Sequence, residues 1–595
     1  MLNLGQFHIL SLAMLSFIHK KSNQFINRQY ACITYFLLIL TLGFLPVMSY
    51  AQDAGTLQRE LELQLQRSAP KPQLQPEKPV PQKQTKPNEQ KVVFKGFKFQ
   101  GNTLLSNAQL EEVVKPWVNT EITFSDLKDV TTAIQNLYAQ NNRIAQATIP
   151  PQDIVEGILL ITINEGKLGS VIVEPAKPGQ KLRFNSETAK LYLINSDEDD
   201  PYINSKPIYR GMALLNGLPG VQATGEFEPG QNLGESDFRV KLSDGPLFSG
   251  QAAVSNYGIS STGVGQVLAS LALNSPTGYG DQANLDAIQS SGSTLAQLAY
   301  SLPVGYDGWR VGVNGNYLTS KTLPGWSENQ VEGTANTIGL NTTYALYRSE
   351  GSSANLRFSV ENRNYQNKQS GAVISQYQIK TTNVAISGSF PDTSQSLINY
   401  SLSGTLGNLN IQNLTQAGAD LSGPGTNGNY TKISFFLSRT QALSFLKDTT
   451  WLLSASGQFA NKNLNSAEQL YMGGPYAVRA YPVAQGASSQ GLILSTQLLY
   501  RFDMGLEVGV FGDLGIAQQY ATLYPDWQGA TNANNIYQLG AVGPTIKYNY
   551  DNWAFDAMAA FRVGQNPLYN SSGEQLNVDN FYRRVQAWIR CTYSF

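Results

Sequence analysis

The chain has 595 residues and a formal net charge of −1, with only 14% charged and 10% aromatic residues and with 53 Gly and 30 Tyr. This near-neutral charge argues against a nucleic-acid partner, which a basic surface would indicate. The two histidines and one of the two cysteines lie within the first 32 residues, and the sequence has no GxxxxGK[ST] motif, so we expect no catalytic residue, metal site or cofactor.

Residues 1–51 have the pattern of a secretory signal peptide. Three basic residues precede an apolar run, which ends in small residues at Ser49 and Ala51. We predict cleavage next to Ala51. The alternative interpretation is an uncleaved membrane anchor.

Residues 52–68 contain a predicted short helix. Leu57, Leu61 and Leu65 fall on one side of a helix, although the run ELELQLQ also alternates with the period of a strand. A helix of this length is marginal alone in water, so we expect it to dock on another part of the protein. Residues 69–91 are rich in proline and predict a partly extended linker of on the order of 50 Å, either a simple spacer or a binding motif.

Residues 92–166 predict a compact α/β unit with the order β-α-α-β-β. The first strand is VVFKGFKFQGN, and two helices follow it. Ser106 and Gln109 in the first helix, and Thr123 and Asp126 in the second, have the spacing of a capping box. The strands RIAQATIP and ILLITINEG close the unit.

Residues 167–245 repeat this order more loosely, with VIVEP as the first strand and SETAKLYLI and SKPIYRGMALLNGL as the helices. Two successive units of the same order indicate an internal repeat of architecture. One irregular α/β domain is the alternative.

Residues 246–595 have a different texture, in which apolar and polar residues alternate over about ten residues between Gly, Asn, Ser and Asp turns. In TKISFFLSR, for example, Ile433, Phe435 and Leu437 fall opposite Lys432 and Ser434. Apolar residues outside and polar residues inside are typical of a membrane β-barrel. At about 20–22 residues per strand and connection, the segment holds about 16 strands; a soluble β-sandwich or solenoid is the alternative.

One loop of this segment, GGPYAVRAYPVAQG (473–486), carries a single cation, Arg479. Just downstream, RFDMGLEVGVFGDLG predicts a strand in which the acidic residues Glu507 and Asp513 share a face. A charged carboxylate that faces lipid costs several kcal/mol of free energy. That face therefore points into the lumen. We predict that the loop, about 461–491, folds into the barrel and that Arg479 pairs with Asp513. Two unrelated charges are the alternative.

The sequences V-R-A-Y and F-G-D-L-G resemble two signature motifs of a superfamily of outer-membrane barrels with periplasmic POTRA domains. The family pattern is V-R-G-Y/F in a long loop that returns into the lumen and F-x-D-x-G on the inner wall, whose Asp receives that Arg. The matching residues are Val478, Arg479, Ala480 and Tyr481 in the loop and Phe511, Asp513 and Gly515 on the wall. Ala480 replaces the family's glycine, which puts the geometry of the loop tip in doubt, because glycine adopts positive φ readily.

Within this superfamily the chain resembles the two-partner secretion transporters, the TpsB type of ShlB, FhaC and HecB. The resemblance implies a 16-stranded outer-membrane barrel, two periplasmic POTRA domains and an N-terminal plug helix that closes the pore at rest. It implies secretion, and in some members activation, of a large partner exoprotein without ATP. The POTRA domains would bind the exoprotein's N-terminal secretion domain, and Phe595 would belong to the signal read by the barrel-assembly machinery before insertion in the lipid bilayer.

Two other functions stay open at this point. An assembly barrel of the same superfamily usually has more than two POTRA domains and no plug helix. A passive channel would not need two periplasmic domains, and the scarcity of histidine argues against most barrel hydrolases. The class of cargo is open as well: a haemolysin, an adhesin, a haem-scavenging protein or a contact-dependent inhibition toxin.

Overall fold

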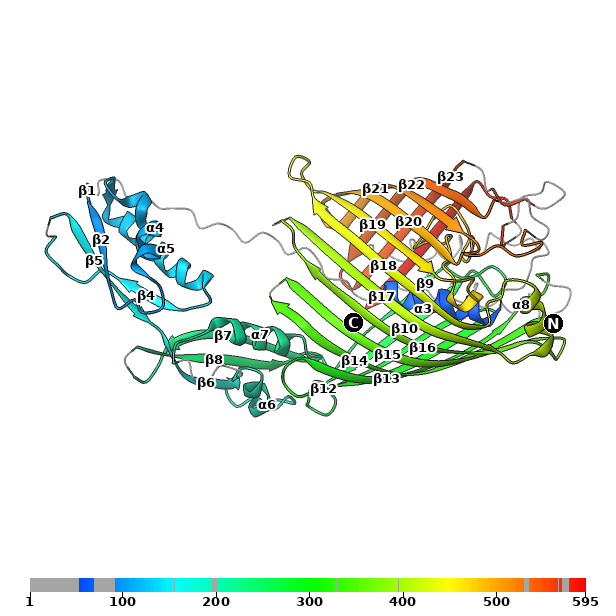
Figure 1. Cartoon of the computed structure of the whole chain (residues 1–595), viewed down its shortest axis with the longest axis horizontal. Coiled ribbons are helices and arrows are strands. Elements are labelled where there is room, and N and C mark those ends of the chain that lie inside the picture. Colours follow the sequence, from blue (N-terminus) through cyan, green and yellow to red (C-terminus); the bar gives the residue numbers. More distant parts are fainter. Residues whose placement is uncertain are drawn as a thin grey trace, which may run out of the picture.

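The protein consists of an N-terminal helix, two α/β units and a β-barrel (Figure 1). The computed structural model describes residues 53–68, 91–154, 156–194, 201–232, 234–326, 330–349, 351–393, 395–528, 534–564, 567–569, 577–579 and 581–595. The predicted signal peptide and, apart from Lys91, the predicted linker lie outside these residues. Among the described residues, no helix is long and apolar enough to cross a membrane.

The first α/β unit has two helices packed on a small sheet of order β2-β5-β4. Its elements are β1 Lys91–Val93, β2 Gly96–Gln100, α4 Asn107–Val114, η1 Lys115–Trp117, β3 Glu121–Thr123, α5 Phe124–Gln140, β4 Ala145–Thr148 and β5 Ile158–Glu165. Both predicted capping boxes are confirmed, at Ser106 with Gln109 and at Thr123 with Asp126.

The prediction of a single strand at the start of this unit was wrong, because the segment forms two strands, β1 and β2. The strand is interrupted between β1 and β2. There the Phe94 carbonyl accepts a hydrogen bond from the Asn119 amide (2.8 Å), and the Lys95 amide donates one to the Gly157 carbonyl (2.8 Å). These bonds replace ladder bonds, and β1 pairs instead with β3, a short strand that the sequence pattern did not predict.

A carboxylate, Glu165 at the end of β5, joins the sheet to helix α5 and to the loop that precedes α4. It accepts hydrogen bonds from Tyr138 Oη (2.8 Å), from the Leu104 amide (2.7 Å) and from Thr103. Burial alone would raise the pKa of Glu165, but the hydrogen bonds from Thr103, Leu104 and Tyr138 hold the pKa below its usual value.

Because this pKa is lowered on folding, Glu165 stabilises the first unit above its unfolded pKa of 4.5, and the contribution is lost as the pH falls through the folded pKa. We expect Glu165→Gln to raise amide hydrogen exchange of β2 and β5 about tenfold at pH 6, since a buried bond to a charged group contributes about 1.5–3 kcal/mol. The difference between the variant and the wild type should shrink as the pH falls below 4.5. Glu112→Gln, which removes an exposed pair with Lys115, is the control. Equal exchange at pH 6 would contradict the prediction.

The second α/β unit repeats the plan with a sheet of order β6-β8-β7. Its elements are β6 Lys167–Pro175, α6 Ser186–Leu191, α7 Ser205–Asn216, β7 Val221–Pro229 and β8 Glu235–Asp244. Helix α6 ends three residues before the predicted end, because the Tyr192 carbonyl lies against α7, where a Cβ on Gly211 would come within 2.2 Å of it. The unit meets the barrel through Arg210, which donates to the Ala345 carbonyl (2.7 Å).

In the described part of the chain, strands β9–β24 form a closed antiparallel barrel of 16 strands, which confirms the predicted architecture. The strands are β9 Phe248–Ser255, β10 Gln266–Asn274, β11 Gln282–Ser290, β12 Ser293–Val304, β13 Trp309–Lys321, β14 Val331–Ser349, β15 Ser352–Gln369, β16 Ala372–Phe390, β17 Ser396–Ile411, β18 Gly428–Ala442, β19 Thr449–Ala460, β20 Gln490–Arg501, β21 Leu506–Gln518, β22 Ile536–Tyr550, β23 Trp553–Val563 and β24 Val585–Ser594. Short helices lie in its connections: α8 Leu414–Ser422, η2 Ser466–Glu468 and η3 Asp503–Gly505.

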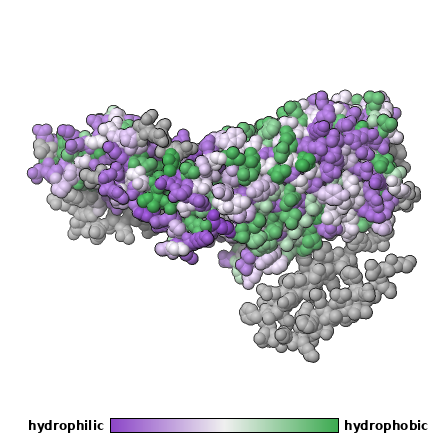
Figure 2. All heavy atoms as spheres, turned by 90° about the horizontal axis from the view of Figure 1, so that it is seen from below, coloured by the Kyte–Doolittle hydropathy of each residue, from purple (hydrophilic) through white to green (hydrophobic). Residues whose placement is uncertain are grey.

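The barrel wall has an apolar outer face and a polar inner face. On β18, Ile433 and Leu437 are exposed, whereas Lys432 between two outward residues is buried in the lumen. Figure 2 shows a hydrophobic band on the barrel, with a more hydrophilic surface at the end away from the α/β units. The strands with this alternation therefore form a membrane barrel rather than a soluble β-sandwich.

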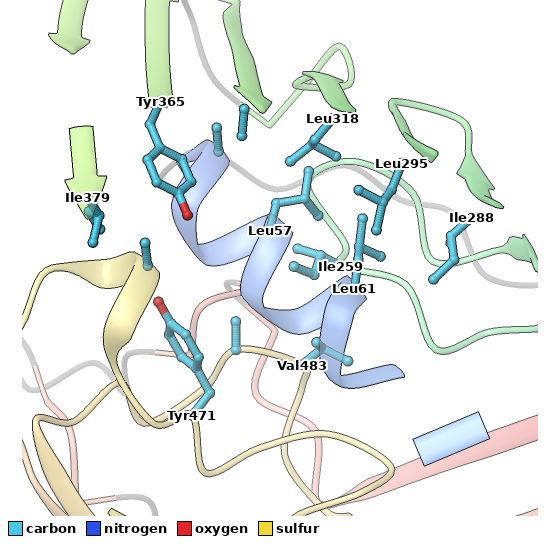
Figure 3. Close-up of a cluster of buried hydrophobic side chains, with 14 of the residues drawn as sticks. Leu57, Leu61, Ile259, Ile288, Leu295, Leu318, Tyr365, Ile379, Tyr471 and Val483 are labelled. Atoms are coloured by element: carbon cyan, nitrogen blue, oxygen red, sulfur yellow. The ribbon is translucent and has the colours of Figure 1, made fainter. Parts of the chain in front are cut away.

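Helix α3, Ala54–Ser68, lies inside this barrel (Figure 1). Its leucine face packs on the inner wall, where Leu57 and Leu61 are buried near Ile288, Leu295 and Leu318 (Figure 3). The helical interpretation of the segment is thus confirmed. A marginal helix is stable here because it buries its apolar side in the lumen.

Candidate functional site

The segment between β19 and β20, residues 461–489, fills the other side of the lumen. Almost all of 471–489 is buried, although its Gly and Pro content is that of an exposed loop. Its own backbone satisfies many of its polar groups: the Val478 amide donates to Met472 (2.8 Å), and the Gly474 amide donates to Tyr481 (3.1 Å). A buried irregular segment needs such bonds to be stable.

At the tip of this loop, Arg479 meets Asp513 of β21. Arg479 Nη2 lies 2.7 Å from Asp513 Oδ1, and Nε donates to Oδ2 at 2.9 Å. The Arg479 backbone amide also donates to Oδ2, at 3.1 Å. Each of the two residues is only 6% exposed. The structure therefore brings the two residues together as a buried, two-point pair, the stronger class of charge-assisted hydrogen bond.

Strand β20 supplies further partners of the guanidinium, and Met558 Sδ of β23 lies 3.8 Å from Nη1. Arg479 Nη2 donates to Ser495 Oγ (3.0 Å) and Nη1 to Gln497 Oε1 (3.1 Å), while Ser495 Oγ donates to Asp513 Oδ1 (2.8 Å). The Phe511 ring lies 3.5 Å from Arg479 Cζ, in cation–π contact. Sequence reasoning missed Ser495 and Gln497, because only the strand register places them beside Asp513 and Phe511.

The neighbours of Arg479 in the loop pack tightly on the wall. Val478 is buried against Gly515, where an added Cβ would lie 2.8 Å from Val478 Cγ2. A side chain at position 515 would therefore push the loop away. Tyr481 lies under the guanidinium of Arg562, with 4.5 Å between Cζ and the ring centre.

The doubt raised by Ala480 concerns backbone conformation. The residues of this loop with positive φ are Gly474 (117°), Ala484 (66°) and Gly486 (71°), and Ala480 is not among them. Alanine therefore fits at position 480 without backbone strain. The tip is also held from outside the loop, because Trp588 Nε1 donates to the Arg479 carbonyl at 2.6 Å.

A second buried charge cluster, which the sequence did not indicate, holds the start of the loop. Glu468 of η2 accepts from Lys432 (2.6 Å) and from Arg363 (3.2 Å), and Arg363 also pairs with Glu361. The alternation of β18 placed Lys432 in the lumen, but nothing local singled out Glu468 as its partner. The loop is thus tied to the wall at two places.

Helix α3 contacts both the loop and the wall. Ser466 Oγ donates to Asp53 Oδ2 (2.6 Å), and Thr56 Oγ1 lies 2.8 Å from Tyr471 Oη. Gln58 Nε2 reaches the wall at Thr337 Oγ1 (2.8 Å). A cavity of about 560 Å³ is left between the helix, the loop and the wall, and its charged lining includes Arg59, Arg67, Arg357, Arg363, Lys432 and Glu468. No group of side chains in the described residues has the composition of a metal site.

At the end of the chain, β24 closes the barrel against β9. The Phe595 amide donates to the Gly250 carbonyl (3.0 Å), and the Gly250 amide donates to the Phe595 carbonyl (2.9 Å). Phe595 itself is exposed on the outer surface. The terminal residue is therefore part of the seam of the barrel.

Comparison with known proteins gives consistent matches. The family model "Haemolysin secretion/activation protein ShlB/FhaC/HecB" matches residues 234–534, and the model "POTRA domain, ShlB-type" matches residues 92–166. The heme/hemopexin transporter protein HuxB of Haemophilus influenzae is 26% identical over 524 residues, which cover 84% of this chain and 91% of that protein. The outer membrane transporter CdiB of Escherichia coli is 26% identical over 420 residues, 67% of each chain.

Solved structures share the fold. CdiB from Escherichia coli has a TM-score of 0.63 at 20% identity and covers 92% of this chain and 100% of its own. CdiB from Acinetobacter baumannii has a TM-score of 0.58 at 16% identity, with the same coverage.

Proposed function

Because the chain belongs to the haemolysin secretion/activation family of ShlB, FhaC and HecB, we propose that it exports a large partner exoprotein through its own barrel. The barrel lies in the outer membrane with the POTRA domains in the periplasm. The relatives include proteins named as heme/hemopexin and hemolysin transporters. We therefore leave the cargo at the class of a large exoprotein, of the haemolysin, adhesin, haem-scavenging or contact-dependent inhibition type.

One observation carries the proposal: the lumen is occupied by two segments that side-chain contacts hold in place. Helix α3 and the loop 461–489 are attached to the wall by hydrogen bonds and ion pairs of side chains. The strands of the wall are held to one another by backbone hydrogen bonds. Displacement of α3 therefore opens a path without breaking the barrel. The folding of the cargo outside the cell would drive transport, since the outer membrane has no ATP.

The two α/β units would receive the cargo before it enters the pore. Each sheet has two edge strands, β2 and β4 in the first unit and β6 and β7 in the second. An edge strand accepts an extended peptide by backbone hydrogen bonds, which depend little on its sequence. The N-terminal secretion domain of the exoprotein would bind there. The terminal strand with Phe595 would be the segment that the barrel-assembly machinery recognises.

Removal of residues 91–244 separates this proposal from a passive channel. In a Gram-negative host that expresses the large exoprotein encoded beside this chain, the wild type should release cargo into the medium and the deletion should release none, at equal amounts of barrel in the membrane. A passive channel would lose no activity, because its conductance does not depend on periplasmic units. Retention of the cargo with the wild type, together with loss of resident outer-membrane proteins on depletion of the chain, would favour the assembly barrel instead.

A further inference from the structure

A groove of about 810 Å³ lies on the outer wall of the barrel, across strands β14 to β18. Its apolar part is formed by outward-facing residues of β14, β15 and β17, which are exposed: Ile338, Leu340, Val360 and Leu406. Its polar part is formed by Asn362, Lys380, Asn408 and Asn429, and the hydroxyls of Thr382 and Thr431 also line it. The groove is therefore amphipathic, and it belongs to the membrane-facing surface rather than to the lumen.

The strand register puts these polar side chains in one row. Asn362 pairs with Lys380, Lys380 with Asn408, and Asn408 with Asn429. Two residues further toward the periplasm, the next outward row contains Leu340, Val360 and Leu406, together with Thr382 and Thr431.

On the extracellular side of the row, the outer face is polar, and Asn364 there bonds to Asn336 (3.0 Å) and Gln378 (3.1 Å). The row around Lys380 thus marks the border between an apolar and a polar surface.

The distance to the other membrane border agrees with this placement. Phe390 and Tyr400, whose rings are 6.0 Å apart, lie at the periplasmic end of β16 and β17. Lys380 precedes Phe390 by about ten residues, and at about 3.3 Å per residue and a tilt of about 40° they are about 25 Å apart along the membrane normal. This is the height of the apolar band of a membrane barrel. Lys380 therefore lies where the acyl chains of the outer leaflet meet their head groups.

The charged residue of this row, Lys380, also lacks an ion-pair partner in the described part of the chain. Among the described residues, Lys380 has no acidic partner, whereas Lys321 on the same wall pairs with Glu332 at 3.1 Å. A cation at this depth extends toward anionic head groups.

We propose that this groove is a binding site for an acylated, phosphate-bearing lipid of the outer leaflet. The ammonium group of Lys380 binds the phosphate of the head group. An acyl chain lies over Leu340, Val360 and Leu406. The inner side of the same strands carries Arg363 and Lys432, which hold the loop, so the lipid would brace the part of the wall on which the loop is anchored.

The test is lipid binding to the purified full chain in non-ionic detergent, counted by native mass spectrometry. The probes are diphosphoryl lipid A, its dephosphorylated form and inorganic phosphate. We expect the wild type to retain diphosphoryl lipid A at least fivefold better than the dephosphorylated form. Lys380→Gln should abolish this preference, and Lys321→Gln, the matched control with an acidic partner, should keep it.

A second variant examines the apolar part of the groove. Leu406→Gln should weaken binding of both lipids about equally, because both have the same acyl chains. Millimolar inorganic phosphate should not displace the lipid, and complete displacement would mean a site for free phosphate instead. Unchanged lipid preference in Lys380→Gln would overturn the proposal. Neither result depends on secretion, because no cargo takes part in the measurement.

Discussion

Replacement of Arg479 by alanine is expected to reduce export of the exoprotein at least tenfold while the barrel still assembles in the outer membrane. The change leaves the Asp513 carboxylate in a site where its side chain is 0% exposed. Breaking one side of a buried pair costs about 3–5 kcal/mol, because an uncompensated charge remains. The loop tip would leave the wall, whereas the strand ladder would stay intact. Cargo in the medium, normalised to folded barrel in the membrane, is the measurement.

The same two strands provide a matched control. Arg501 and Glu507 also pair across β20 and β21, but at the periplasmic end, where the Arg501 side chain is 69% exposed and the Glu507 side chain 13%. A pair whose cation is in water contributes about 0–1 kcal/mol, so Arg501→Ala should leave export within twofold of the wild type. Arg479→Lys should export poorly, because an ammonium group cannot make the two-point contact with Asp513. Equal loss of the barrel itself in Arg479→Ala would show that the pair serves folding rather than transport.

The second large effect concerns the helix in the lumen. Deletion of residues 54–68 should raise the ion conductance of the purified protein in planar bilayers severalfold, because it removes the segment that fills the space between loop and wall. The buried Leu57 and Leu61 hold this helix in place, and each contributes about 1.5–3 kcal/mol. A conductance equal to that of the wild type would mean that α3 does not close the pore.

A single substitution examines the same point without a deletion. Gly55 lies so close to the wall and the loop that a Cβ would be 2.4 Å from Tyr377 Oη of β16 and 2.9 Å from Ala467 Cβ of η2. Gly55→Val should therefore loosen the helix and increase the frequency of open-channel events. Gln66→Ala, at an exposed position of the same helix, should behave like the wild type. Similar records for both variants would argue against a tight fit of α3 in the lumen.

Much of the fold was predictable because its signals are local. The capping boxes at Ser106 and Thr123 depend on spacings of three residues, and both are present. The alternation in β18 shows within nine residues which side faces lipid. Helix α3 was harder, because its sequence fits a strand as well; the lumen decides for the helix by burying Leu57 and Leu61.

The residues of the candidate site also fall into those that the sequence indicated and those that it did not. Arg479 and Asp513 stood out because a lone cation in an uncharged loop and an acid on a lumen-facing strand each need an explanation. Ser495 and Gln497 did not stand out, because they become partners of Arg479 only through the register of β20 with β21.

The sequence by itself therefore determined the periodicities, the capping signals and the charges that could not face lipid. Only the tertiary structure decided that Glu468 meets Lys432, that the first strand is interrupted between β1 and β2, and that Ala480 needs no positive φ. The physical reason is distance along the chain. Periodicity and capping are settled by neighbours within a few residues, whereas these contacts join segments tens of residues apart, whose meeting depends on how the whole barrel closes.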